Sequence, residues 1–170
     1  MDGLKAAGIL FVASLLQTSV LGGYGPFRSA SIVLVTLLSI ALLRGSVFGA
    51  VAGFGTGLLL DTAALGTLGV TSLLLTVAGF WIGRYGETTA RDRFHAPYLS
   101  VAVVTVLYAY GQILLEFVLG EPAPAGLATH QLPAALLVNL LLTLPIYVLV
   151  RRLLPPAELS DRVREVRLLG

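Results

Sequence analysis

Apolar residues fall into six long runs, separated by short segments that are polar or rich in glycine and proline. The runs cover residues 4–21, 30–43, 45–60, 68–85, 98–119 and 132–150. A helix that spans a bilayer needs about 20 mainly apolar residues, and most of the runs approach or reach that length. The pattern therefore predicts an all-α integral membrane protein with six transmembrane helices.

The six runs form one predicted transmembrane domain over residues 1–155, followed by a short cytoplasmic tail over residues 156–170. We interpret the first run as a retained helix, because no small-x-small cleavage site followed by a polar sequence comes after it. In the tail, Leu159, Val163 and Val166 recur at helical spacing among arginines. This spacing predicts a short helix at the membrane surface.

Glycines recur at every fourth position of the third run, and a similar pair ends the fourth. They are Gly45, Gly49, Gly53 and Gly57 in the third run and Gly79 and Gly83 in the fourth. In water each interior glycine would cost a helix about 1 kcal/mol relative to alanine. In a bilayer the backbone must stay helical, and a glycine face lets another helix approach closely. The stripe therefore predicts a packing seam, against a helix of this chain or of a partner.

Asp61 follows the glycine stripe and is a lone carboxylate among apolar residues. Residues 45–60 would form a helix of only about 24 Å, which is shorter than the hydrocarbon core of about 30 Å. We therefore expect this helix to lead into a packed segment over residues 61–67. Asp61 has three interpretations: it is the N-cap of a short turn at residues 62–65, it contacts a partner or ligand, or it has no specific role.

Polar residues inside the runs are expensive in hydrocarbon and point to function. On the fifth run Thr105, Tyr108, Gln112 and Glu116 share one helix face, and on the sixth Asn139, Thr143 and Tyr147 do the same. We expect the two faces to meet and enclose an outward-facing polar pocket. Its predicted residues are Gln17, Tyr108, Gln112, Glu116 and Asn139. Alternatively, Asn139 and Gln112 hold helices together, and Glu116 reaches headgroup water.

Composition supports a membrane protein, with 56% hydrophobic residues, 12% charged residues and a mean hydropathy of +0.91. Soluble domains carry roughly 25% charged residues, so the soluble class is excluded. The chain has no cysteine, which excludes disulfides, metal–thiolate sites and thiol catalysis. The net charge of +2 comes from residues at helix ends, and we infer no nucleic-acid binding from it.

Lys and Arg residues set the predicted orientation, because cytoplasmic loops carry most of them. With a cytoplasmic N-terminus and six crossings, ten of the 11 lie on the cytoplasmic side. These ten are Lys5, Arg44, Arg84, Arg91, Arg93, Arg151, Arg152, Arg162, Arg164 and Arg167. Arg28 alone lies outside, so both termini are expected in the cytoplasm.

Catalytic motifs are missing from the sequence. There is no HExxH, no Walker loop and no GxGxxG after a strand. His95 and His130 are expected on opposite sides of the membrane. The charged segment over residues 84–97, which contains Glu87 and Asp92, is expected to be a solvated surface loop. We therefore predict no enzyme, no cofactor and no metal site.

Residues 43–87 resemble the MreD family of bacterial rod shape-determining membrane proteins. The resemblance rests on the glycine-rich helix, the GLLLD of residues 57–61, Leu68 and Gly69, and a following helix that ends in glycine, arginine and tyrosine. It implies membership of the cell-elongation complex in the bacterial inner membrane. There MreD pairs with the single-pass protein MreC and works with MreB, RodA and a transpeptidase. The resemblance also implies a fold similar to the substrate-binding components of energy-coupling-factor vitamin transporters, and it carries over no catalytic residue.

The leading hypothesis is thus a non-enzymatic, multi-pass scaffold that binds MreC and regulates peptidoglycan synthesis and cell shape. Its partners would be MreC, other elongation-complex proteins and membrane lipid. One alternative is a substrate-binding subunit of a vitamin transporter. Another is a membrane enzyme that acts on lipid-linked cell-wall intermediates, which would depend on Asp61 or Glu116.

Overall fold

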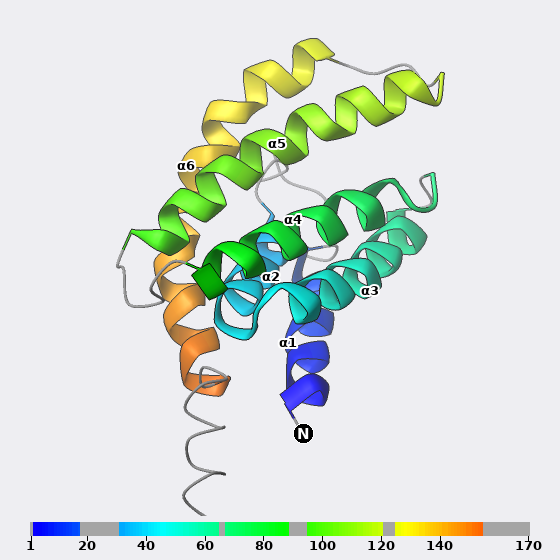
Figure 1. The fold of residues 1–170 in the computed structure, drawn as a ribbon. Helices are drawn as coiled ribbons and strands as arrows, with labels where there is room; N and C mark the ends of the chain where they lie inside the picture. The colour runs from blue at the N-terminus through cyan, green and yellow to red at the C-terminus, as the bar shows by residue number, and fades with distance from the viewer. Residues whose placement is uncertain (1, 18–30, 65–66, 89–94, 121–124, 155–170) are drawn as a thin grey trace, which may run out of the picture.

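The computed structural model describes residues 2–17, 31–64, 67–88, 95–120 and 125–154, and within these it is helical with no strand. The helices are α1 (Asp2–Leu16), α2 (Ile32–Arg44), α3 (Ser46–Ala64), α4 (Val70–Thr88), α5 (Ala96–Val118) and α6 (Ala125–Leu153). Figure 1 shows α3 and α4 lying side by side, with α5 and α6 forming a second pair and α1 below them. The predicted turn after the first run, the segment over residues 89–94 and the predicted tail helix lie outside the described residues.

Helix α2 forms the centre of the molecule. All of residues 33–43 are buried, and the helix packs against each of the other helices (Figure 1). A helix that is apolar on every side has no face to turn toward a polar phase, so it is covered by protein. At about 1.5 Å per residue, this short helix is about 20 Å long, which is less than the thickness of the hydrocarbon core.

Within the described ranges, three helices are long and apolar enough to cross a membrane by length and composition, at Ser46–Ala63, Ala96–Val118 and His130–Leu153. Gly3–Leu16 and Ile32–Arg44 are apolar but shorter. An all-helical fold is therefore confirmed over the described residues. The count of six crossings stays a prediction.

Two expected boundaries are wrong. The third helix continues through Asp61 to Ala64, which brings it to about 28 Å and removes the expected packed segment. Helix α6 begins at Ala125, inside a stretch predicted to be a loop because of its prolines and glycines. Residues 125–132 contain no proline, so the helix of the sixth run extends back over them to Ala125. Pro133 and Pro145 lie inside α6, which changes direction along its length in Figure 1.

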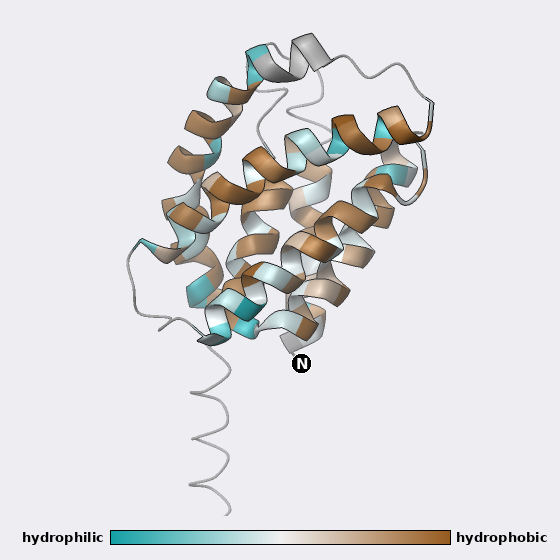
Figure 2. Cartoon of the chain, turned by 45° about the horizontal axis from the view of Figure 1, so that its top comes forward, coloured by the Kyte–Doolittle hydropathy of each residue, from teal (hydrophilic) through white to brown (hydrophobic). Residues whose placement is uncertain are grey.

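Basic residues gather at one end of the bundle. α1 begins and α6 ends there, since Lys5 and Leu153 line the same groove. α2 also ends there and is joined to α3 by Gly45 alone, at a φ of 95° that favours glycine. All Lys and Arg among the described residues lie near these helix ends, namely Lys5, Arg44, Arg84, Arg151 and Arg152. We call this the basic end. Figure 2 shows hydrophilic residues toward the helix ends and hydrophobic residues between them.

Candidate functional site

The glycine stripe of α3 packs against α4. A Cβ atom added to Gly49 would meet the carbonyl oxygen of Gly79, and one added to Gly53 would meet the carbonyl oxygen of Leu75. A Cβ on Gly57 would meet the backbone of Ser72. These are backbone atoms, which cannot move aside as the end of a side chain can. The two helices therefore approach as closely as their backbones allow.

Glycines of α4 complete this contact from the other side. A Cβ on Gly79 would meet the carbonyl of Gly49, and one on Gly83 would meet the backbone of Gly45. Gly86, which the sequence analysis did not single out, similarly faces the carbonyl of Leu42. The sequence left open whether the seam's neighbour belonged to this chain, and in the structure the neighbour is α4 together with the α2–α3 junction.

Asp61 caps the start of α4 from the end of α3. Its Oδ2 accepts hydrogen bonds from the N–H groups of Gly69 at 2.8 Å and Ser72 at 3.3 Å. Its Oδ1 accepts from the N–H of Thr71 at 3.2 Å, and the side chain is only 4% exposed. The first N–H groups of a helix have no intrahelical partner, so a carboxylate from another helix supplies one here.

The prediction that Asp61 caps a turn at residues 62–65 is wrong, because residues 62–64 continue α3. A carboxylate near the C-terminus of its own helix faces the negative end of the helix dipole. The start of α4 offers the positive end and free N–H donors. The carboxylate therefore binds across the helix pair.

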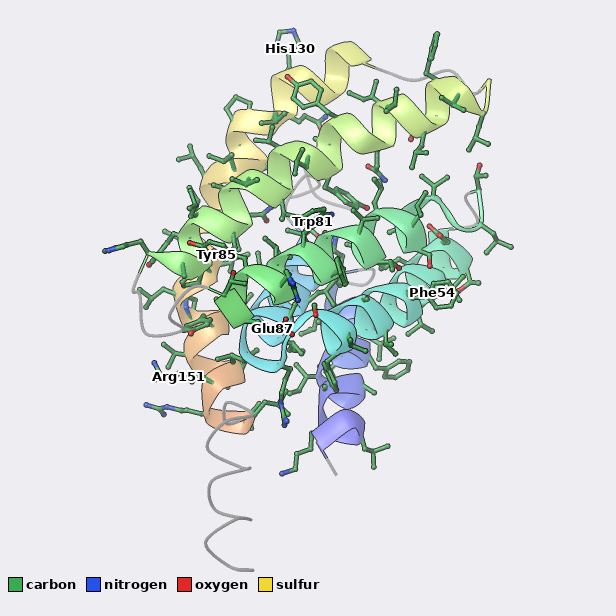
Figure 3. All side chains as sticks on the ribbon, in the orientation of Figure 1. Phe54, Trp81, Tyr85, Glu87, His130 and Arg151 are labelled. Carbon is green, nitrogen blue, oxygen red and sulfur yellow. The ribbon has the colours of Figure 1, made fainter. Side chains whose placement is uncertain are left out.

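Glu87 makes the matching contact at the basic end. Its Oε1 accepts from the N–H of Ser46 at 2.7 Å and from the Ser46 hydroxyl at 3.0 Å. Ser46 is the first residue of α3, and Glu87 lies near the end of α4 (Figure 3). Arg84 lies 3.9 Å from the other carboxylate oxygen. Helices α3 and α4 are therefore antiparallel, and each supplies the carboxylate that caps the other.

Glu87 was expected in a solvated surface loop, and its role as a helix cap was not predicted. The available signal was its position directly after Gly86, the last glycine on the α4 face of the seam. Asp61 similarly comes one helical turn after Gly57. In both helices the acidic residue follows the last seam glycine and lies where the partner helix begins.

A second polar cluster surrounds the start of α2. The N–H of Ser31 donates to Asn139 Oδ1 at 2.9 Å, and the N–H of Val33 donates to Gln17 Oε1 at 3.1 Å. The Ser31 hydroxyl accepts from the N–H of Leu34 at 3.1 Å. Side chains from α6 and from the residue after α1 therefore satisfy the first donors of α2.

Asn139 extends this cluster to α5, because its Nδ2 donates to the Thr105 hydroxyl at 3.1 Å. The Asn139 side chain is 1% exposed. The backbone carbonyl of Asn139 accepts from the Thr143 hydroxyl at 2.7 Å. A buried amide whose donor and acceptor are both engaged links helices rather than facing a cavity. The structure thus brings Gln17 and Asn139 together at Ser31, as structural groups.

The other residues of the predicted polar pocket lie further along α5. Gln112 Nε2 donates to the Tyr108 hydroxyl at 3.3 Å. Glu116 is half-buried one turn after Gln112. The pocket that these residues were expected to line with Gln17 and Asn139 remains a prediction.

Two grooves that the structure describes are apolar and are lined by none of these five residues. One lies between α1 and α6, with a volume of about 770 Å³. The other lies between α1 and α3, with a volume of about 310 Å³. Small residues form much of the second groove, namely Gly3, Ala6, Ala7, Ala52 and Gly55.

Large apolar side chains are exposed beside the second groove. On α3 they are Val47, Val51, Phe54, Leu58 and Leu59, and Val47 and Val51 are 73% and 69% exposed. Apolar residues exposed in such a row face lipid or another protein.

Chemical groups for catalysis are sparse. No group of three or more His, Cys, Asp or Glu residues that could hold a metal occurs within the part of the chain that the structure describes. His95 lies just before α5 at the basic end, and His130 lies near the start of α6 at the other end. Asp61 and Glu87 are each engaged by backbone N–H groups.

Comparison with known proteins identifies the family of the chain. No curated protein and no solved structure matched the chain. A family model described as rod shape-determining protein MreD matches residues 8–155, which include both caps of the α3–α4 pair and the α2 polar cluster. The glycine seam and the GLLLD segment on which the resemblance rested lie inside this match. The chain therefore belongs to the MreD family of rod shape-determining proteins.

Proposed function

We propose that this chain is a non-enzymatic, multi-pass scaffold of the bacterial inner membrane that binds MreC and thereby regulates peptidoglycan synthesis and cell shape. Family membership itself gives the chain a role in rod shape determination. The finer proposal rests on one observation: the buried Asp61 and Asn139 cap helices inside the bundle, whereas the outer faces of α1 and α3 are apolar and grooved.

Polar groups support a scaffold because their hydrogen bonds are internal. Asp61 receives three backbone N–H groups, and Asn139 uses both its amide nitrogen and its oxygen. A reacting or ligand-binding group would need a free face. A rigid bundle held by such bonds suits a protein that presents a fixed surface.

The surface proposed for MreC is the groove between α1 and α3. Its small residues let a transmembrane helix approach closely, as a lipid-exposed glycine or alanine face does in membrane helix pairs. The exposed Val47, Val51 and Phe54 beside it supply further apolar contact. The seam glycines are less suited to this role, since α4 already covers them.

The proposed topology has six crossings with both termini in the cytoplasm. The gathering of Lys5, Arg84 and Arg151 at one end of the bundle supports it, because basic residues mark the cytoplasmic side. Similarity to energy-coupling-factor substrate-binding components rests on the family resemblance alone.

Site-specific photo-cross-linking in cells tests the MreC surface. A photoreactive residue in place of Val51 should yield a cross-linked product with MreC. The matched control is Leu107 on α5, which is exposed to a similar degree. Cross-links to MreC from position 107 and none from position 51 would overturn the proposed surface. Recovery of ATPase subunits or a stoichiometric vitamin with the purified protein would overturn the scaffold.

A further inference from the structure

The groove between α1 and α6 has a restricted length. On α1 it runs from Lys5 to Leu16, and on α6 from Leu142 to Leu153. At about 1.5 Å per residue, each side is about 16 Å long. This is close to one leaflet of the hydrocarbon core, whose full thickness is about 30 Å. The groove is therefore matched in length to a lipid acyl chain of one leaflet.

The groove begins at the level of the charged residues. Lys5 lines its open end, and the exposed Arg151 and Arg152 precede Leu153 on the opposite wall. Its inner end is set by Leu16 and Ile32, the residues beside the polar cluster at the start of α2. The groove therefore occupies the leaflet at the basic end, with its cation at headgroup depth.

The lining suits a hydrocarbon chain. Among the described residues that line it, only Lys5 and Thr36 carry polar side chains. The Thr36 hydroxyl donates to the Ile32 carbonyl at 2.7 Å, so its hydrogen bond is satisfied. Gly8 leaves space on the α1 wall, because a Cβ added there would meet no atom within 4 Å. The volume of about 770 Å³ falls within the range of about 300–1,000 Å³ typical of small-molecule sites.

We propose that this groove binds an anionic phospholipid of the leaflet at the basic end, with an acyl chain along Gly8 and Leu149 and the phosphate group against Lys5. The site goes beyond the scaffold function, because it lies on a different face of α1 from the proposed MreC surface. Lysine near an anionic membrane surface favours a negatively charged headgroup over a zwitterionic one by about fivefold.

Native mass spectrometry of the full chain tests the proposal. The protein is released from detergent that contains equal amounts of dioleoyl phosphatidylglycerol and dioleoyl phosphatidylcholine. The wild type should retain one phosphatidylglycerol in preference to phosphatidylcholine. Gly8→Leu fills the groove without meeting the backbone, and it should lower retention of both lipids by about tenfold. Lys5→Gln should abolish the preference between the headgroups and leave chain binding in place.

Gly55→Leu is the matched control, since Gly55 also has open space around it but lines the groove between α1 and α3. It should leave lipid retention unchanged. Equal retention in the wild type and Gly8→Leu would overturn the site, and so would an unchanged headgroup preference in Lys5→Gln. Because Lys5 is exposed, Lys5→Gln should fold normally and can test the site even if Gly8→Leu fails to fold. Absence of MreC cross-linking from position 51 of the otherwise unchanged chain, with lipid retention intact, would count against the scaffold surface alone.

Discussion

Asp61 and Glu87 lie at opposite ends of the α3–α4 pair, and each carboxylate caps the helix to which it does not belong. Asp61 on α3 accepts N–H groups at the start of α4, and Glu87 on α4 accepts the N–H of Ser46 at the start of α3. Between them the two helices touch through glycines. The pair is thus fixed both in closeness and in register, because sliding one helix along the other would break both caps.

Asp61→Ala should lower the free energy of unfolding by about 2 kcal/mol, because it leaves buried N–H groups of α4 without an acceptor. Trp81 is the only tryptophan, and it lies on α4. Its fluorescence during unfolding in mixed detergent micelles provides the measurement. Thr62→Ala is the control, since Thr62 is exposed and bonds only within α3, and it should change stability by less than about 0.5 kcal/mol. Equal stability of the two variants would refute the cap.

Glu87→Ala should cost less, about 0.5–1 kcal/mol, because this carboxylate is partly exposed to solvent. The double variant with Asp61→Ala should show additive losses. Ser46 and Asp61 are separated by about 22 Å along α3, well beyond the range of about 7–10 Å in which sites couple. A strong coupling energy in the double-mutant cycle would mean that α3 and α4 dock only as a unit.

Gly53→Leu should prevent normal assembly of the bundle, because its side chain would occupy the position of the Leu75 carbonyl. Gly49→Leu should act in the same way against Gly79. Size-exclusion chromatography of fluorescently tagged protein in detergent reports the outcome as loss of the monodisperse peak. Gly55→Leu, on the open side of the same helix, should keep that peak. A monodisperse Gly53→Leu variant would contradict the close backbone contact.

Asn139→Leu should destabilise the fold by about 1–2 kcal/mol, because Ser31 and Thr105 lose their shared partner. Thr105→Val keeps Asn139 Oδ1 as the acceptor for the Ser31 N–H and removes the hydroxyl that accepts from Asn139 Nδ2. The difference between the two variants, measured by the same unfolding experiment, separates the cap of α2 from the link to α5. Identical losses would assign the whole effect to the link with Thr105.

The sequence by itself determined the class of protein and the positions of the helices. Long apolar runs cannot be solvated, and an isolated backbone in lipid must bond to itself, so each run forms a helix near its predicted place. The glycine stripe likewise predicted a close helix contact, because only a small residue permits one.

Only the tertiary structure decided which groups meet. The local sequence suggested that Asp61 caps the next turn, whereas its donors come from a helix start that another segment brings beside it. Glu87 was assigned to a loop for the same reason. The first N–H groups of α2 bond to Gln17 and Asn139, which lie 14 and 108 residues from Ser31 along the chain. A helix end inside the membrane takes its hydrogen-bond partner from whatever side chain the packing places there. Local sequence patterns do not contain information on packing between segments that are far apart in the sequence.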